Sequence, residues 1–561
     1  MAGVVALLAL AASATSLRNG FTYDDRWIIA ENDRVHQLRA LWTYFTESYW
    51  PMRSGAALYR PVVIVLYSVQ WVVGNGSPLI FHAVNVLLAA ACAVAVFWVG
   101  GFILPIGVAM LAAALFAVHP VHVEAIANTV GQAELWAALV VLLACGLYLR
   151  DRRDGALRRE TGLAICALFL VGLFTKEHVI VLPALLVAIE LLICTDGTWR
   201  SRLDRLRLLL WPLAAIVALY LAVRVQVIGD VAGDVEHPVL RHRTMIERVR
   251  IMMSVFPEYA RLLLVPARLY ADYSPRQFEV YPSPQASMLA GTVLLGSAAV
   301  LFVLALLRSR PAAFGLAWLV IVIAPVTNIL VPTGILVAER TLFLPSVGAM
   351  FALAVGADLV RRRLIADRSP LRRALPALLV AALVAGVWRS ATRNAFWHDS
   401  NSAFAQMAVD APLNFKAHYA YGGQLFEEKR PREGEIEWRM AIALYPTYHG
   451  VYVDLAHRYR MAHLCDAALP LYRKAIELEP ELPVVVVSIA ACQLELARWH
   501  EARTTARVAI ADGLYKKAFR YIADRADSAL VENDSLDATI GQKWLDRRRP
   551  RGAGAAAPSP K

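Results

Sequence analysis

The feature that most constrains this chain is a series of long apolar stretches that recur along its first 391 residues and then stop. A helix needs about 20 predominantly apolar residues, with a range of about 17 to 25, to cross the hydrocarbon core of a bilayer. We interpret eleven stretches as membrane spans: 2–17, 78–102, 103–118, 131–149, 161–175, 178–194, 208–227, 286–308, 312–331, 341–360 and 374–391. Only 18% of the 561 residues are charged, against about a quarter in a soluble domain, and 58% are hydrophobic. These observations predict an all-α, polytopic membrane protein and exclude a soluble enzyme, a disordered scaffold and a disulfide-rich secreted module.

The short connectors between the spans predict the side of the membrane on which each loop lies. Arginines concentrate in four connectors that share one face when eleven spans are counted: 150–160, 195–207, 308–310 and 361–373. The opposite short connectors, 118–130 and 175–177, contain only Lys176. Because basic residues mark the cytoplasmic face, we expect three regions to be external: 17–77, 228–285 and everything after residue 391. The same rule explains the net charge of +12, so no nucleic acid partner is expected.

Two segments leave alternatives open. Residues 2–16 could be the core of a signal peptide, but the absence of a basic region before them favours a membrane helix. The stretch 246–266 carries three interleaved arginines, whose burial at bilayer depth would be costly. We therefore expect an interfacial or re-entrant helix there, and not a span.

A period of 34 residues begins after residue 391. The pairs Ala441-Ile442, Ala475-Ile476 and Ala509-Ile510 follow it, as do Pro446 and Pro480 and the aromatic residues Trp438 and Tyr472. This spacing resembles the tetratricopeptide repeat, a helical hairpin with small residues at the crossing of its helices. We predict a membrane domain over 1–391, a tetratricopeptide repeat solenoid over 392–546 and a disordered tail over 547–561. Cys465 and Cys492 could pair, but their separation in the sequence makes packed thiols the expectation.

Carboxylates and histidines adjoin the external ends of the predicted spans. Asp24 and Asp25 follow the first helix, where partial desolvation would make a carboxylate a better proton acceptor. His119, His122 and Glu124 are clustered in apolar surroundings; they could ligate a metal ion, but we favour a hydrogen-bonded network that shapes a pocket. Further charged residues on this face are Arg60, Lys176, Glu177, Glu339 and Arg340. Several cations at one membrane surface would suit the phosphate of a lipid carrier.

In order along the chain, the motifs YDDRWIIAEND, YRPV, GSPLIFHAVNVLL, HPVHVEAIANTVGQAELW, TKEH and AERTLFLPS precede the repeats. This arrangement resembles the transmembrane-and-tetratricopeptide-repeat (TMTC) proteins and their bacterial relatives over about residues 19–515. The resemblance implies a GT-C glycosyltransferase fold with about eleven membrane helices and a polyprenyl-phosphate-linked sugar as donor. In the animal members, it implies transfer of mannose from dolichyl phosphate to Ser or Thr of cadherin-type domains.

The resemblance also assigns roles to residues. It carries Asp24 and Asp25 onto the acidic motif of the first external loop, Glu339 and Arg340 onto a Glu-Arg motif, and His119, His122 and Glu124 onto the HPxHxE segment. The chain departs from the animal members in its start close to the first helix and in its short array of about three repeats, which puts the acceptor class in question. Its preference for Arg over Lys is typical of a GC-rich bacterial genome. We therefore predict a bacterial-type member with its active face in the periplasm, or in the endoplasmic reticulum lumen of a eukaryote.

The predicted reaction needs few catalytic groups, because a sugar on a lipid phosphate already has a good leaving group. One base must accept the proton of the acceptor hydroxyl, and cations must neutralise the departing phosphate. We predict Asp24, or else Asp25, as the base and Arg340, helped by Arg60 or Lys176, as the phosphate ligand. The function is then transfer of mannose or another hexose to Ser or Thr of exported proteins that the repeats hold. No cofactor is required by this scheme, and a divalent metal ion is left open.

Three alternatives remain. The chain could be a membrane-anchored adaptor without catalysis, although far fewer spans would suffice for an anchor. The acceptor could be a lipid-linked glycan or cell-wall polymer. A transporter is disfavoured, because the charged residues gather at one surface and not at the bilayer midplane, where transport sites lie.

Overall fold

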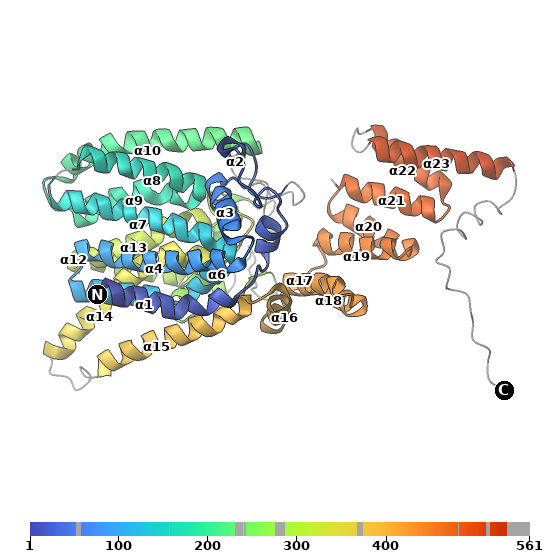
Figure 1. Ribbon diagram of the computed structural model, residues 1–561. Coiled ribbons are helices and arrows are strands. Elements are labelled where there is room, and N and C mark those ends of the chain that lie inside the picture. The colour runs from blue at the N-terminus through green and yellow to red at the C-terminus, as the bar shows by residue number, and fades with distance from the viewer. Residues whose placement is uncertain are drawn as a thin grey trace, which may run out of the picture. The chain divides into compact units, whose positions relative to one another are not determined.

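The computed structural model describes residues 1–51, 58–155, 157–230, 239–240, 243–274, 286–331, 333–366, 374–480, 482–511 and 516–535. Every regular element in these ranges is a helix, so the predicted all-α class is confirmed for the described part of the chain. The chain divides into two units, Met1–Pro412 and Leu413–Lys561 (Figure 1). Residues 392–412, which we assigned to the repeat domain, group with the first unit, and the domain boundary at residue 391 stays a prediction. The predicted tail 547–561 lies outside the described residues.

Six helices of the first unit are long and apolar enough to cross a membrane. They are α4 (Pro78–Ile103), Thr129–Arg153 with α7 (Gln132–Arg153), α10 (Trp199–Ile228), α12 (Ala286–Arg308), Glu339–Ala366 with α14 (Phe343–Ala366), and Ala374–Trp397 with α15 (Ala374–Asn394). A seventh span would be bent by 49° between α5 (Ile106–Ala117) and the segment Pro120–Ala127, which contains α6 (Val123–Ala127). The described part of the chain thus has six or seven such spans where the sequence predicted eleven.

The other four predicted spans form shorter helices. They are α1 (Ala2–Ser13), α8 (Arg159–Thr175), α9 (Leu182–Ala188) and α13 (Arg310–Ile323). Three of them continue into 3-10 or π-helical turns, at Ala14–Arg18 after α1, at Ile189–Ile193 after α9 and at Ala324–Val326 after α13. A count of apolar residues in the sequence does not detect these changes of helix type, which is why eleven uniform spans were predicted.

The helices of the first unit differ in how much of their apolar surface the protein itself covers. In α7, 78% of the apolar window is buried, and in α4 56%, so these helices form the centre of the bundle. In α12 and α15 the buried shares are only 11% and 6%, as expected for helices that face lipid. Close packing of α13 on α14 depends on Gly315 and Gly348: a Cβ atom on Gly348 would lie 2.3 Å from the carbonyl oxygen of Gly315.

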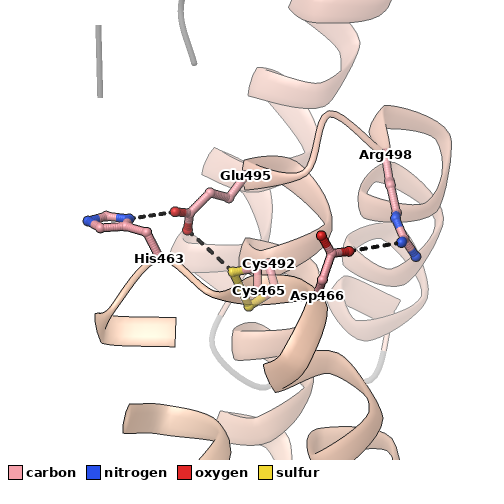
Figure 2. The surroundings of a disulfide bond; sticks show 6 residues. All are labelled: His463, Cys465, Asp466, Cys492, Glu495 and Arg498. Atoms are coloured by element: carbon pink, nitrogen blue, oxygen red, sulfur yellow. Dashed lines mark hydrogen bonds and ion pairs between the residues drawn. A yellow bond between two sulfur atoms is a disulfide. The ribbon is translucent and has the colours of Figure 1, made fainter. Parts of the chain in front are cut away.

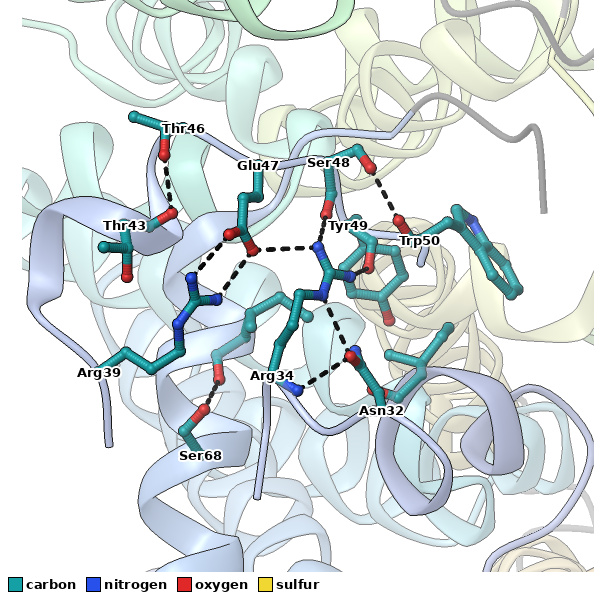
Figure 3. Close-up of polar contacts among 12 residues, drawn as sticks. Asn32, Arg34, Arg39, Thr43, Thr46, Glu47, Ser48, Tyr49, Trp50 and Ser68 are labelled. Atoms are coloured by element: carbon teal, nitrogen blue, oxygen red, sulfur yellow. Dashed lines mark hydrogen bonds and ion pairs between the residues drawn. The ribbon is translucent and has the colours of Figure 1, made fainter. Parts of the chain in front are cut away.

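The described residues of the region 17–77, which we predicted to be external and call the first external region, form more than a simple loop. The region contains a π-helical turn (Arg26–Ala30), the single-turn helix α2 (Leu41–Tyr44) and the apolar helix α3 (Pro61–Gly74). The sequence analysis predicted a loop as far as residue 77 and therefore missed α3, whose 14 residues are too few for a span. Arg34 and Arg39 both bind the carboxylate of Glu47, with distances of 3.2 and 2.8 Å (Figure 3). These two ion pairs connect parts of the region that are separated in the sequence, so the chain turns back on itself there.

The amphipathic stretch in the second external region forms α11 (Met245–Leu264). Thr244 and Glu247 form a capping box at its start, and Ile251, Met252 and Val255 are buried against the protein. This helix is not among the span-length apolar helices of the described residues. That finding agrees with the prediction that the stretch does not cross the bilayer.

The second unit repeats one helical hairpin. Its helices are α17 (Phe415–Glu427), α18 (Pro431–Leu444), α19 (His449–Met461), α20 (Cys465–Leu478), α21 (Pro483–Glu495), α22 (Trp499–Ala511) and α23 (Lys516–Ser535). The helices α17, α19 and α21 start 34 residues apart, and so do α18, α20 and α22. Lys429, His463 and Ala497 have positive φ angles of 61°, 60° and 59° at the same place in each hairpin. The period seen in the sequence is therefore also a period of the backbone.

A disulfide joins two neighbouring hairpins and corrects our expectation of packed thiols. It links Cys465, the first residue of α20, to Cys492 on α21 (Figure 2). The two residues are 27 positions apart, but α20 packs on α21 and their Cα atoms lie 5.2 Å apart. The carboxylate of Glu495 lies 3.4 Å from the sulfur of Cys465 and 2.5 Å from Nδ1 of His463. Distance along the sequence was a poor guide because the hairpins stack.

Removing this disulfide is expected to destabilise the second unit. A cross-link that closes a loop of 27 residues stabilises a fold by about 3 kcal/mol, mainly by restricting the unfolded chain. The Cys465→Ser and Cys492→Ser variants of the full chain should each melt at a lower temperature and be cleaved faster by protease within residues 413–511. Cys166→Ser, at a cysteine outside any disulfide, is the control. Equal melting of wild type and variants, with and without reductant, would contradict the expectation.

Candidate functional site

The predicted site residues come from the first external region, the segment around α6, the connection between α8 and α9, and the 3-10 turn Glu339–Leu342 before α14. In Figure 1, α3 and α6 lie at the same end of the bundle, opposite the N-terminus. Gly20 N–H donates to the carbonyl of His398 (2.8 Å), and Thr22 Oγ1 donates to that of Trp397 (3.1 Å). These bonds fix the start of the first external region against the end of α15.

Asp25 is fully buried and holds the backbone of two segments. Its carboxylate accepts hydrogen bonds from the N–H groups of Thr22 (3.2 Å), Thr129 (3.1 Å) and Val130 (2.7 Å). Burial raises the pKa of Asp25 to about 7, although these hydrogen bonds oppose the shift. A carboxylate surrounded by three backbone donors connects the first external region to the turn before α7. This arrangement favours Asp24 over Asp25 as the residue that faces a substrate.

The raised pKa of Asp25 makes a prediction about stability. In the unfolded chain an aspartate titrates near pH 4, so the folded state binds the proton more tightly. The contribution of Asp25 to stability is therefore complete below about pH 4 and is lost as the pH rises through about 7.

In Asp25→Asn, the amide NH₂ would face backbone donors, which should cost about 1–3 kcal/mol. Thermal melts at several pH values should show a lower melting temperature and a flatter pH dependence for Asp25→Asn than for wild type; an unchanged slope would contradict this assignment.

Asp24 is half-buried beside Tyr23, and several charges converge there. Burial and the negative charges of Asp24 and Asp272 raise the pKa of Tyr23 well above its usual value, and the charge of Arg340 opposes them. Asp24 also acts electrostatically on Arg340 itself. The acid predicted as the base thus lies within electrostatic range of the cation predicted as the phosphate ligand, although 316 positions separate them in the sequence.

Arg340 is held by Glu124. The carboxylate of Glu124 accepts from the backbone N–H of Arg340 (2.8 Å) and lies 2.5 Å from its Nη1. Glu124 is buried, whereas 21% of the Arg340 side chain remains exposed. Arginine has five N–H donors in a planar fork, and this pairing leaves donors for a second anion.

Glu339 has a different role from its neighbour Arg340. Its buried carboxylate accepts from the backbone N–H of Tyr270 (2.5 Å) and the hydroxyl of Tyr273 (2.9 Å). These bonds hold the segment 269–274, which contains Asp272, an acid whose charge acts on Tyr23. Glu339 therefore fixes the position of the segment that contains Asp272.

The remaining predicted cations also have carboxylate partners. Arg60 and Glu177 form two parallel hydrogen bonds, of 3.0 and 2.5 Å. Lys176 Nζ lies 2.6 Å from the buried carboxylate of Glu134. The charge of Glu134 acts on both Arg60 and Arg340, which places the Lys176–Glu134 pair within electrostatic range of the other two. The predicted cations thus form three separate ion pairs that lie within electrostatic range of one another.

The histidines of the HPxHxE segment have structural contacts. His119 Nε2 lies 3.1 Å from the carbonyl of Leu263, and its Nδ1 accepts from the N–H of Val121 (3.3 Å). His122 Nε2 lies 2.9 Å from Ser346 Oγ, and its ring packs between two phenylalanines. Within the described ranges, no group of three or more His, Cys, Asp or Glu side chains could hold a metal ion. Among the described residues, His119, His122 and Glu124 each bind a different partner and do not form one set of metal ligands.

Sequence reasoning missed Tyr23 and Asp272. Tyr23 directly precedes the acidic pair in the motif YDD, so the motif itself contained a signal. Asp272 lies in LYADYS, an acid among aromatic residues in the second external region, which is the pattern that drew attention to Asp24. Neither residue had a predicted partner, because the segments that meet here lie far apart in the sequence.

Comparison with known proteins identifies relatives along most of the chain. Protein O-mannosyl-transferase TMTC4 of Homo sapiens is 25% identical over 484 residues, which cover 76% of this chain and 64% of the relative. TMTC3 of Mus musculus is 24% identical over 83% of this chain and 53% of its own length. Tmtc1 of Drosophila melanogaster is 28% identical, over 80% of this chain and 62% of its own length.

The chain spans 53% to 64% of the length of these curated relatives. No protein-family profile matches it. The matched relatives share one name, protein O-mannosyl-transferase, and the alignments cover 76% to 83% of this chain. In sequence, the chain is therefore similar to the TMTC protein O-mannosyl-transferases over most of its length.

Proposed function

We propose that this protein is a membrane glycosyltransferase that moves mannose or another hexose from a polyprenyl-phosphate carrier to a hydroxyl group of an exported protein. The observation that carries this proposal is the neighbourhood of Asp24 and the Glu124–Arg340 pair. A carboxylate beside an arginine with remaining donors is what a base and a phosphate ligand require. The names of the relatives favour mannose as the sugar and protein as the acceptor.

In the proposed reaction, the acceptor oxygen attacks the anomeric carbon of the donor. The bond from that carbon to the phosphate oxygen breaks, and its electron pair leaves on the polyprenyl phosphate. Asp24 accepts the proton of the acceptor hydroxyl, and Arg340 stabilises the charge that develops on the phosphate. A single displacement of this kind inverts the anomeric centre. Arg60 and Lys176 are each paired with a carboxylate. They would add to the positive electrostatic potential with which Arg340 stabilises the phosphate.

We place the site and the repeats on the external side of the membrane. Disulfides persist in oxidising compartments such as the periplasm or the endoplasmic reticulum lumen, and Cys465–Cys492 lies in the second unit. The arginine-rich connectors favour the cytoplasm for the opposite face. The hairpins of the second unit, which we interpret as tetratricopeptide repeats, would hold an extended segment of the acceptor.

Mass spectrometry of exported proteins tests the proposal in cells. Cells that contain the protein should carry hexose on Ser or Thr residues of exported proteins, and cells that lack it should not. Restoring the wild-type gene should restore the modification. Identical glycopeptides in both cell types, with a change confined to lipid-linked or cell-wall glycans, would move the acceptor from protein to glycan.

A further inference from the structure

Tyr23 combines an unusual backbone conformation with a place at the centre of the site. Its φ angle is 59°, in the left-handed region that residues other than glycine rarely adopt. Holding such a residue costs about 1–3 kcal/mol, and conformations of this kind cluster at functional sites. The strained backbone marks this position as a candidate functional residue.

The ring of Tyr23 is fixed by aromatic packing. It meets Trp397 edge-on, with ring centroids 6.4 Å apart, and Phe404 at 5.7 Å. Trp397 is buried, and its carbonyl accepts from Thr22, the residue before Tyr23. The hydroxyl makes no hydrogen bond to the described part of the chain, so its orientation is set by the ring alone.

The charges around Tyr23 come from four separate segments. Asp24, Glu124 and Asp272 are the acids whose fields reach the phenol, and Arg340 is the cation. Burial and these acids keep the phenol protonated at neutral pH, because they raise its pKa. Tyr23 therefore offers a hydrogen-bond donor next to the proposed base in the sequence and within electrostatic range of the proposed phosphate ligand.

We propose that Tyr23 is a further catalytic residue, whose hydroxyl donates a hydrogen bond to a phosphate oxygen of the polyprenyl-phosphate donor. This inference rests on the proposed function. When the bond between the sugar and the phosphate breaks, the phosphate gains negative charge and the hydrogen bond strengthens. Tyr23 keeps its proton throughout, the acceptor proton goes to Asp24, and the leaving group departs as polyprenyl phosphate.

Tyr23→Phe isolates the hydroxyl, since it keeps the ring and the backbone. The experiment uses the full chain in lipid nanodiscs and measures transfer from polyprenyl-phosphate-mannose and, separately, binding of polyprenyl phosphate. A hydrogen bond to a charged group corresponds to about 10- to 100-fold, so kcat and product affinity should each fall by factors in this range. The pH profile of transfer should keep its wild-type shape, because Tyr23 is not the base. Tyr44→Phe, which removes a hydroxyl that bonds to the backbone of Gln37 and Arg39, is the control and should retain wild-type kinetics.

The outcomes separate this inference from the proposed function. Wild-type transfer and wild-type product binding by Tyr23→Phe would overturn the role of Tyr23 and leave the proposed function intact. A changed pH profile with unchanged product binding would also overturn it, because the phenol would then act on the acceptor. If the wild-type protein neither transfers sugar nor binds polyprenyl phosphate, the proposed function itself fails.

Discussion

Replacement of Asp24 by asparagine is expected to abolish sugar transfer and leave the fold intact. The amide has nearly the shape of the carboxylate but cannot accept the proton of the acceptor hydroxyl. General-base catalysis contributes about 10²- to 10⁴-fold, so turnover should fall by a factor in this range. The measurement is initial rate at saturating donor, with donor binding determined separately. Binding should change little compared with turnover.

Asp25→Asn is the matched comparison, since the two aspartates are adjacent and chemically identical. Asp25 is bound to three backbone N–H groups, so its replacement should lower stability more than turnover per folded molecule. The reverse result, with Asp24→Asn active and Asp25→Asn folded but inactive, would assign the base to Asp25. Normal turnover in both variants would exclude the proposed mechanism.

Replacement of Arg340 by alanine should have two large effects. Loss of the guanidinium removes the donor to the departing phosphate, and losing one such donor lowers turnover by about 100- to 1000-fold. It also leaves the buried carboxylate of Glu124 without its cation, which costs about 3–5 kcal/mol when one partner of a buried pair is removed. Donor kinetics and thermal melting of the same preparation measure the two effects.

Double replacement separates these effects. In Arg340→Ala with Glu124→Gln, no uncompensated carboxylate remains, and the glutamine oxygen can still accept from the backbone N–H of residue 340. Stability should therefore recover in part, while transfer stays low. Recovery of both stability and transfer would show that Arg340 acts only by maintaining the fold.

The sequence was informative about which residues matter and much less informative about their partners. Ionisable residues beside apolar helices are costly, so Asp24, Glu124 and Arg340 stood out without a structure. Their pairing did not follow from position: Arg340 binds Glu124, 216 positions earlier, and its neighbour Glu339 binds Tyr270 and Tyr273. Adjacent residues diverge because the chain presents them to different segments, and only the packed fold determines those segments.

The apolar pattern of the sequence predicted where helices form but not how long each helix is. Apolar runs identified the helices of the membrane unit, because burial in lipid or in protein requires apolar side chains. They did not distinguish a span from a short helix such as α3, nor from α1 and α13, which end in 3-10 turns. In the second unit the 34-residue period predicted the hairpins well, because every repeat has the same local packing. For Cys465 and Cys492 the period gave no distance between the sulfur atoms, which depends on how α20 packs on α21.

The most direct test of the account is transfer by the purified full chain in nanodiscs. The assay supplies polyprenyl-phosphate-mannose labelled in the sugar and an exported protein as acceptor, and it compares wild type with Asp24→Asn at equal donor binding. The account predicts labelled acceptor and released polyprenyl phosphate with wild type, and neither with Asp24→Asn. Equal labelling by the two proteins, or none by a folded wild type that binds the donor, would contradict it.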